Sequence, residues 1–229
     1  MSTFLLLECS PHGERSLGGQ VARDAIEQFQ FGRPEVRLVT RNVATDGLRA
    51  LSAAYAQGLF ESWTHTSDAF PDSEQLIDEL EQSSYVLIST PMHNFAVPSA
   101  LRLWIDHIVR DGRTFKRGTR GKIGLLKDRP TLVLIRSGTP CFGERASQPD
   151  FLTPYLRHVF SVIGIHSTEF VYLAGEDPTA GDIAVARAKL TASLEFSSRV
   201  FRSVRNTERT GRNEGSISTT DGLHGRNDA

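Results

Sequence analysis

The sequence predicts an α/β fold in which a mostly parallel sheet is covered by helices on both faces. Short apolar runs of strand length recur along the chain, amphipathic segments of helix length lie between them, and the two alternate from residue 4 to residue 204. Continuous apolar runs are typical of strands buried on both faces. Strands that alternate with helices form parallel sheets through right-handed crossovers.

The strands are predicted where apolar residues, many of them Val, Leu or Ile, run without interruption by Gly or Pro. Such runs fit the pleated, buried surface of a central strand. The predicted strands cover residues 4–8 (FLLLE), 36–40 (VRLVT), 85–89 (YVLIS), 131–135 (TLVLI) and 168–173 (TEFVYL).

The helices are predicted from apolar residues that recur with helical spacing. In the segment 16–29, apolar residues from Leu17 to Phe29 lie at i, i+4 and i+8, whereas Arg23 and Glu27 take the opposite face. The same pattern predicts helices at residues 72–82, 99–110, 150–163 and 180–204, and in weaker form at 46–60.

The chain changes character after Val204, where RNTERTGRNEGSISTTDGLHGRNDA begins and bulky apolar residues nearly vanish. Such a segment buries too little surface to offset the entropy lost on ordering. We therefore predict one domain over residues 1–204 and a disordered C-terminal tail over residues 205–229.

Composition argues against several classes of partner and site. With 26 basic and 27 acidic residues, the formal net charge of −1 gives no field that attracts nucleic acid or an anionic membrane. Cys9 and Cys141 lack CxxC spacing and the histidines lack HxH or HExxH spacing, so neither a disulfide framework nor a metal site is predicted. Cys9 is expected to be a buried residue.

The N-terminus has no basic segment and no apolar run approaches the roughly 18 residues of a membrane helix, so a cytoplasmic protein is expected.

The loop after the first strand, CSPHGERSLGGQ, is the first candidate binding segment. The hydroxyls of Ser10 and Ser16 lie beside the free amides of a first helical turn, which suits a phosphate, and Gly18 and Gly19 let the backbone approach a ligand closely. The chain has no GxGxxG and no GxxxxGK[ST], so a mononucleotide fits better than a dinucleotide. The alternative is that Ser16 only caps the helix and the glycines fill a loop.

The loop after the third strand, PMHNFAVP, places apolar and amide side chains together at the sheet edge. Met92, Phe95 and Asn94 would suit a flat heteroaromatic ring, whose faces need van der Waals contact and whose rim needs hydrogen bonds. The alternative is a turn in which Met92 and Phe95 fill the core. In the third loop, 136–150, small residues after a strand would admit the polar edge of the ring.

These segments resemble the FMN-dependent NADH azoreductases, also called NADH:quinone oxidoreductases, which are flavodoxin-like and carry PMYNF where this chain has PMHNF. The similarity continues in the spacing of VRDGRTFKRGTRGKIGLLKDR and in DFLTPYLRHVFSVIGI, close to the family's TPYL…FIGI. It covers roughly residues 1–200.

The resemblance implies a three-layer sandwich with a five-stranded parallel sheet of order 2-1-3-4-5. It implies tightly bound FMN, NADH or NADPH as electron donor, and a homodimer that reduces quinones and azo compounds by a ping-pong mechanism, with the chemistry on the flavin. By position, the implied phosphate ligands are Ser10, Ser16, Leu17 and Gly18, the ring contacts are Met92, His93, Asn94 and Phe95, and the contacts of the polar rim are Arg136, Ser137, Gly138 and Thr139.

The chain departs from the family pattern in three places. His93 replaces a tyrosine, RSGT replaces SRGG at 136–139, and residues 42–71 and the C-terminal tail are not family-like. Two alternative functions stay open: a non-enzymatic flavin-binding shuttle or redox sensor, and a related reductase of nitroaromatics or metals.

Two further segments carry expectations. The charged segment 115–122 is expected to be a solvated loop, with a basic patch as the alternative. Part of the apolar surface around the helix 99–110 is expected to pack against a second subunit, because it exceeds what one sheet face needs; this surface comprises Leu103, Trp104, Ile105 and Ile108.

Overall fold

The fold is built on a five-stranded sheet in which every neighbouring pair of strands is parallel. The computed structural model describes residues 2–61 and 70–214. The strand order is β2-β1-β3-β6-β7, and since β6 and β7 are the fourth and fifth strands of this sheet, the predicted order is confirmed. The strands are β1 (Ser2–Glu8), β2 (Val36–Asn42), β3 (Tyr85–Pro91), β6 (Thr131–Ser137) and β7 (Thr168–Ala174).

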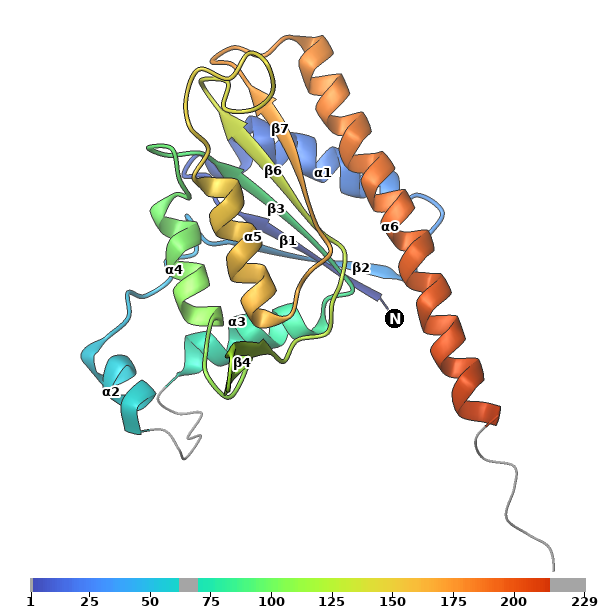
Figure 1. Ribbon diagram of the computed structural model, residues 1–229. Helices are drawn as coiled ribbons and strands as arrows, with labels where there is room; N and C mark the ends of the chain where they lie inside the picture. The colour runs from blue at the N-terminus through green and yellow to red at the C-terminus, as the bar shows by residue number, and fades with distance from the viewer. Residues whose placement is uncertain (1, 62–69, 215–229) are drawn as a thin grey trace, which may run out of the picture.

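Helices cover both faces of the sheet and make the predicted three layers (Figure 1). Helices α1 and α6 pack on one face, and α3, α4 and α5 pack on the other. The helical elements are η1 (Gly13–Arg15), α1 (Leu17–Gln30), α2 (Ala53–Glu61), α3 (Pro71–Gln82), α4 (Ser99–Ile108), α5 (Leu152–Ile163) and α6 (Ala180–Glu214). None of the helices within these described ranges is long and apolar enough to cross a membrane.

The continuous apolar runs follow from burial on both faces. Along β1, Leu5 and Leu7 belong to the core under α3, α4 and α5, whereas Phe4 and Leu6 belong to the core under α1 and α6. All four side chains are at most 1% exposed. Because successive side chains of a strand point to opposite faces, the central strand positions that are covered by helices on both sides are apolar in succession.

Two of the predicted boundaries are wrong. Helix α6 continues to Glu214, beyond the predicted helix end at residue 204. Adding a residue to an existing helix costs little, and Arg and Glu favour helices, so the loss of apolar residues does not by itself end one. The rest of the predicted tail, 215–229, lies outside the described residues. Helix α2 begins at Ala53, later than the predicted 46.

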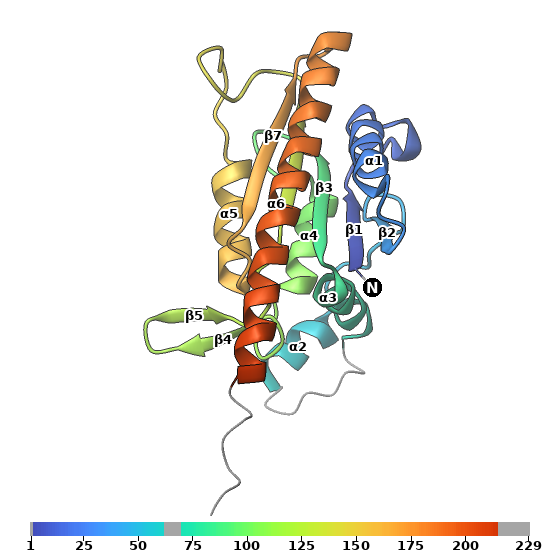
Figure 2. The same ribbon diagram turned by 90° about the vertical axis from the view of Figure 1, so that its right-hand side faces the viewer.

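Most of the charged segment 115–122 is exposed, as expected, but the segment belongs to a β-hairpin and not to a loop. Strands β4 (Phe115–Gly118) and β5 (Gly121–Gly124) pair antiparallel and project from the body of the molecule (Figure 2). Each strand has only four residues, and most of them are exposed. Strands that short and that solvated show no apolar alternation, which is why the sequence pattern missed them.

The helix face predicted to meet a second subunit is largely used within the chain. Trp104, Ile105 and Ile108 of α4 are at most 2% exposed because they pack in the core under α3, α4 and α5. Only Leu103 is partly exposed. Of this helix surface, Leu103 therefore remains the part that could meet a second subunit.

A close backbone contact joins the hairpin to α5. Gly164 ends α5 with φ of 100°, and a Cβ on Gly124 would lie 2.2 Å from the Gly164 nitrogen. Since backbone atoms cannot step aside as a side chain does, Gly124→Ala is expected to destabilise the protein by about 1–3 kcal/mol or more, as overpacking does. Thermal unfolding measures this loss. Gly181→Ala is the control, because its Cβ would meet nothing closer than 3.5 Å, and an equal loss in both variants would contradict the prediction.

Candidate functional site

A cleft of about 980 Å³ opens at the carboxyl edge of the sheet. The chain leaves β1 and β3 in opposite lateral directions here, and ligands of open α/β sheets bind at such a reversal of strand order. The cleft is lined by Ser10, Pro11, His12, Arg15, Ser16, Leu17, Gly18, Ser89, Thr90, Pro91, Met92, His93, Arg136, Gly138, Glu176, Asp177, Pro178 and Ile183.

The first wall of the cleft is the turn into α1. Ser16 is the N-cap, and its hydroxyl accepts a hydrogen bond from the Gly19 N–H at 3.3 Å. The first two helical N–H groups, those of Leu17 and Gly18, have no acceptor within the described part of the chain. Ser16 therefore does cap the helix, and the same turn still presents two free donors to a ligand.

Gly18 has a steric reason to be glycine. A Cβ at this position would lie 3.1 Å from the Ser89 hydroxyl and 3.8 Å from the Arg136 Cβ. Ser89 is only 3% exposed, so it has little room to move. The backbone of α1 therefore approaches β3 closely. Because no side chain at position 18 narrows it, the space in front of the turn into α1, called the cradle below, stays open to a ligand.

The second wall is a tight turn after β3. The backbone N–H of each of His93 and Ala96 donates a hydrogen bond to the backbone oxygen of the other, at 3.0 Å in both cases. The two residues between them, Asn94 and Phe95, have φ of 48° and 68°. Two consecutive positive φ angles define a type I′ turn. Asn adopts this conformation readily, whereas Phe does so rarely and at a cost in strain, which is a feature of functional sites.

The turn divides the PMHNF motif between two places. Met92 and His93 line the cleft, whereas Asn94 and Phe95 form the tip of the turn and do not. Phe95 is 46% exposed, so the alternative that it fills the core is wrong, although Met92 does pack against the core.

Arg136 supplies a fixed positive charge to the cleft. Its guanidinium donates to the backbone oxygens of Ser137 at 2.7 Å, Glu176 at 2.8 Å and Leu173 at 3.4 Å. No carboxylate forms an ion pair with it within residues 2–61 and 70–214. Desolvation lowers its pKa, partly opposed by Asp177. A cation held by carbonyl groups alone favours an anion beside it.

The rest of the RSGT loop is turned away from the cleft, apart from Gly138. Ser137 is 3% exposed, and its hydroxyl donates to the Thr139 oxygen. The Gln148 amide donates to the Ser137 hydroxyl at 2.9 Å, the Thr139 oxygen at 3.0 Å and the Met92 sulfur at 3.5 Å. Ser137 and Thr139 therefore fix the loop, and the cleft receives only Arg136 and Gly138 from this segment.

The cleft brings together most of the predicted site residues. Those that line it are Ser10, Ser16, Leu17, Gly18, Met92, His93, Arg136 and Gly138. Asn94, Phe95, Ser137 and Thr139 do not line it. Sequence reasoning missed Arg15 and His12, although both stand in the loop it singled out, and it missed the connection from β7 to α6, which carries no motif.

Other groups outside the cleft have structural roles. Cys9 is 1% exposed, as expected, and burial raises the pKa of its thiol. His107 is 3% exposed, and its Nε2 lies 2.9 Å from the Arg49 oxygen. Among the side chains that the structure describes, no group of three or more His, Cys, Asp or Glu is arranged to hold a metal ion.

The lining residues fit a ligand that combines a terminal phosphate with a flat ring. The free N–H groups of Leu17 and Gly18 point to the phosphate end, and Met92 offers an apolar contact to a ring. The cleft is at the upper end of the size range of small-molecule sites. Glu176 and Asp177 add negative charge at the rim, where both are exposed.

The comparisons with known proteins agree with this fit. Residues 2–194 match a family model described as a flavodoxin-like fold. The chain is 50% identical over 199 residues to FMN-dependent NADH:quinone oxidoreductase 5 of Burkholderia lata, covering 87% of this chain and 98% of the relative. It is 46% identical over 175 residues to FMN-dependent NADH:quinone oxidoreductase 4 of Pseudomonas fluorescens, covering 76% of this chain and 85% of the relative.

A solved structure shares the fold. The FMN-dependent NADH-azoreductase of Bacillus anthracis, in complex with FMN, matches with a TM-score of 0.73 at 21% identity, covering 87% of this chain and 99% of that one. Because the family model spans most of the chain and a relative that is half identical is matched almost end to end, this chain belongs to the flavodoxin-like family of FMN-dependent NADH:quinone oxidoreductases.

Proposed function

We propose that this protein is an FMN-dependent oxidoreductase that takes two electrons from NADH or NADPH and passes them to a quinone or an azo compound. The observation that carries the proposal is the cleft, where the open cradle at Gly18 and the wall of Met92 and His93 share one edge of the sheet. The relatives support it, because those with the greatest similarity reported above are FMN-dependent NADH:quinone oxidoreductases.

In this proposal the turn into α1 holds the cofactor phosphate. The N–H groups of Leu17 and Gly18 and the hydroxyls of Ser10 and Ser16 donate to it, and the partial positive charge of the helix N-terminus adds to their effect. Arg15 lies at the same end of the cleft, is exposed, and neutralises part of the phosphate charge from the solvent side.

The ring binds between the turn after β3 and the end of β6. Once bound, FMN supplies the two-electron chemistry. Met92 and His93 contact the ring, and Arg136 and Gly138 meet its polar rim. The remaining predicted site residues act from outside the cleft: Asn94 and Phe95 shape the turn, and Ser137 and Thr139 hold the RSGT loop.

We propose a ping-pong reaction in a homodimer. Donor and acceptor would use the same space in turn, because one cleft holds all the residues that fit the flavin and no GxGxxG segment exists to bind a dinucleotide separately. The homodimer rests on the family resemblance, since most of the apolar face of α4 is buried within the chain.

The test of the proposal starts from the purified protein. Cofactor released by heat should be FMN, and NADH should be consumed when a simple quinone is added. Initial rates at several fixed quinone concentrations should give parallel double-reciprocal lines, and the protein should sediment at twice its chain mass of 25.3 kDa. A flavoprotein that does not oxidise NADH would be a shuttle or sensor, intersecting lines would indicate a ternary complex, and a fully active monomer would exclude the dimer.

We also propose a cytoplasmic location. Cys9 and Cys141 are both free thiols, which fits a reducing compartment.

Residues 1–204 are proposed to contain the whole flavin-binding domain. The last cleft residue is Ile183, and the last described contact of α6 with the sheet includes Ser198, whose hydroxyl lies 3.2 Å from that of Tyr85. A truncated protein that ends at Val204 should therefore fold, keep its flavin and reduce quinones. A control that ends at Ala192 loses Leu194, which is fully buried, and should not fold. Loss of flavin in the longer variant would show that residues beyond 204 belong to the domain.

A further inference from the structure

A buried carboxylate lies against the proposed phosphate cradle. Glu8 is the last residue of β1, and it is 6% exposed. Its Oε1 lies 3.0 Å from the place that a Cβ of Gly19 would occupy, so the carboxylate packs against the first turn of α1. Gly19 is the neighbour of Gly18, which lines the cleft. A negative charge so near the helix N-terminus would repel a phosphate and compete with it for the same positive end of the helix.

Arg23, on the next turn of α1, compensates the negative charge of Glu8. Its Nη1 forms an ion pair with Glu8 Oε1, and its Nη2 donates to the backbone oxygen of Glu14 at 2.9 Å. The Gln20 amide donates to the same oxygen at 3.4 Å. The Arg23 side chain is one-third exposed, whereas that of Glu8 is 8% exposed, so the arginine reaches inward to the buried partner.

The two contacts of Arg23 have two different effects. The pair with Glu8 cancels a charge that desolvation would otherwise make costly and that the phosphate would feel. The bond to Glu14 ties η1, which carries the cleft residue Arg15, to α1. Arg15, the exposed cation at the phosphate end of the cleft, forms no ion pair with Glu8 in the described part of the chain.

We propose that Arg23 is a positioning residue for the cofactor phosphate, and that its main role is to neutralise Glu8 beside the cradle. This inference rests on the proposed function, because it takes the turn into α1 as the place where the FMN phosphate binds. Arg23 does not line the cleft and acts through Glu8 and the helix turn. With Arg23 in place, the phosphate meets free amides and cations, and without it the phosphate meets an uncompensated carboxylate.

The charge pair gives a double-mutant test with flavin-free protein. FMN and riboflavin, which lacks the phosphate, are titrated into the wild type, Arg23→Met, Glu8→Gln and the double variant, and flavin fluorescence reports binding. Arg23→Met should bind FMN about tenfold or more weakly, whereas its affinity for riboflavin should change little. The double variant should recover most of the FMN affinity, because the repulsive charge is gone. Arg23→Lys, which keeps the charge, should bind FMN nearly as the wild type does.

Each other outcome counts against the inference. If the double variant binds FMN as weakly as Arg23→Met, the bond to Glu14 matters and the charge does not. If riboflavin and FMN lose affinity equally, the effect is on folding or on the ring. If Arg23→Met does not fold, Glu8→Gln and Arg23→Lys decide, since a loss of FMN affinity in either would overturn the inference. A wild type that binds neither flavin would refute the proposed function, whereas one that binds FMN no better than riboflavin would refute this inference.

Discussion

Replacing Gly18 with Asp is expected to abolish FMN binding. The N–H groups of Leu17 and Gly18 are free donors, and hydrogen bonds to a charged group contribute about 1.5–3 kcal/mol each. The loss of both corresponds to an affinity reduced by roughly 100-fold to 10,000-fold. An aspartate side chain would reach into the cradle, accept these bonds itself and repel the phosphate.

The size of the new side chain must be separated from its charge. A Cβ at position 18 meets the Ser89 hydroxyl at 3.1 Å, so any residue larger than glycine carries some steric cost. Gly18→Ala measures that cost alone, and Gly18→Asn has the shape of aspartate without the charge. FMN is titrated into the flavin-free proteins, and far-UV circular dichroism checks that they are folded. The affinity for FMN should fall in the order wild type, Gly18→Ala, Gly18→Asn and Gly18→Asp. Equal flavin content in the wild type and Gly18→Asp would place the phosphate elsewhere.

The sheet was predictable because its strands are buried on both faces. A run such as 132–135 has no polar position, and only a middle layer between helices needs that pattern. The hairpin β4–β5 had no such signal, since its two four-residue strands consist mainly of charged residues and glycines and its position depends on the contact between Gly124 and Gly164. That contact joins segments far apart in the sequence, and local patterns do not contain it.

The site was predictable at its loops but not at the level of single side chains. Arg136 and Ser137 are adjacent in β6, so their side chains must point to opposite faces of the sheet. Arg136 reaches the cleft, whereas Ser137 is buried and holds Thr139. Strand alternation could have separated the two residues in the sequence. No pattern could have found Glu8 and Arg23, because their pairing depends on how α1 packs beside β1.

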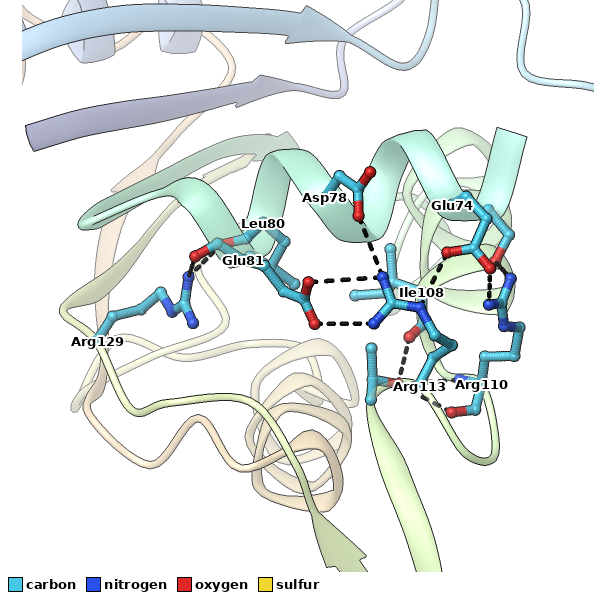
Figure 3. Close-up of polar contacts among 10 residues, drawn as sticks. Glu74, Asp78, Leu80, Glu81, Ile108, Arg110, Arg113 and Arg129 are labelled. Atoms are coloured by element: carbon cyan, nitrogen blue, oxygen red, sulfur yellow. Dashed lines mark hydrogen bonds and ion pairs between the residues drawn. The ribbon is translucent and has the colours of Figure 1, made fainter. Parts of the chain in front are cut away.

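The second large prediction concerns the carboxylates of α3 and the arginines that pair with them. Figure 3 shows Arg113 between three carboxylates of α3, those of Glu74, Asp78 and Glu81, and Arg110 bound to Glu74. The Arg110 side chain is only 5% exposed, and it also donates to the Ser73 hydroxyl at 3.1 Å. Both arginines lie in the segment of chain that connects α4 to the hairpin. Their ion pairs therefore attach both elements to α3.

Glu74→Gln is expected to lower the free energy of unfolding by about 3–5 kcal/mol, because it leaves the buried guanidinium of Arg110 without a negative partner. For a chain of this size, that loss lowers the melting temperature by roughly 6–20 °C. The control is Arg117→Met, which breaks the exposed pair with Asp111 and should cost about 1 kcal/mol or less. Calorimetry of both variants measures the difference, and equal melting temperatures would show that the pair with Arg110 contributes nothing.

The same variant should show a characteristic dependence on pH. Burial opposes ionisation of Glu74, but hydrogen bonds from Arg110 and Arg113 outweigh it, so the pKa of this carboxyl in the folded protein lies below its usual value. A lowered folded-state pKa stabilises the protein above the usual pKa of glutamate, and the stabilisation disappears as the pH falls through the folded-state pKa. The gap in unfolding free energy between wild type and Glu74→Gln should therefore be widest near neutral pH and shrink on acidification. A gap that stayed constant down to the acid limit of folding would mean that the loss comes from packing and not from the charge of Glu74.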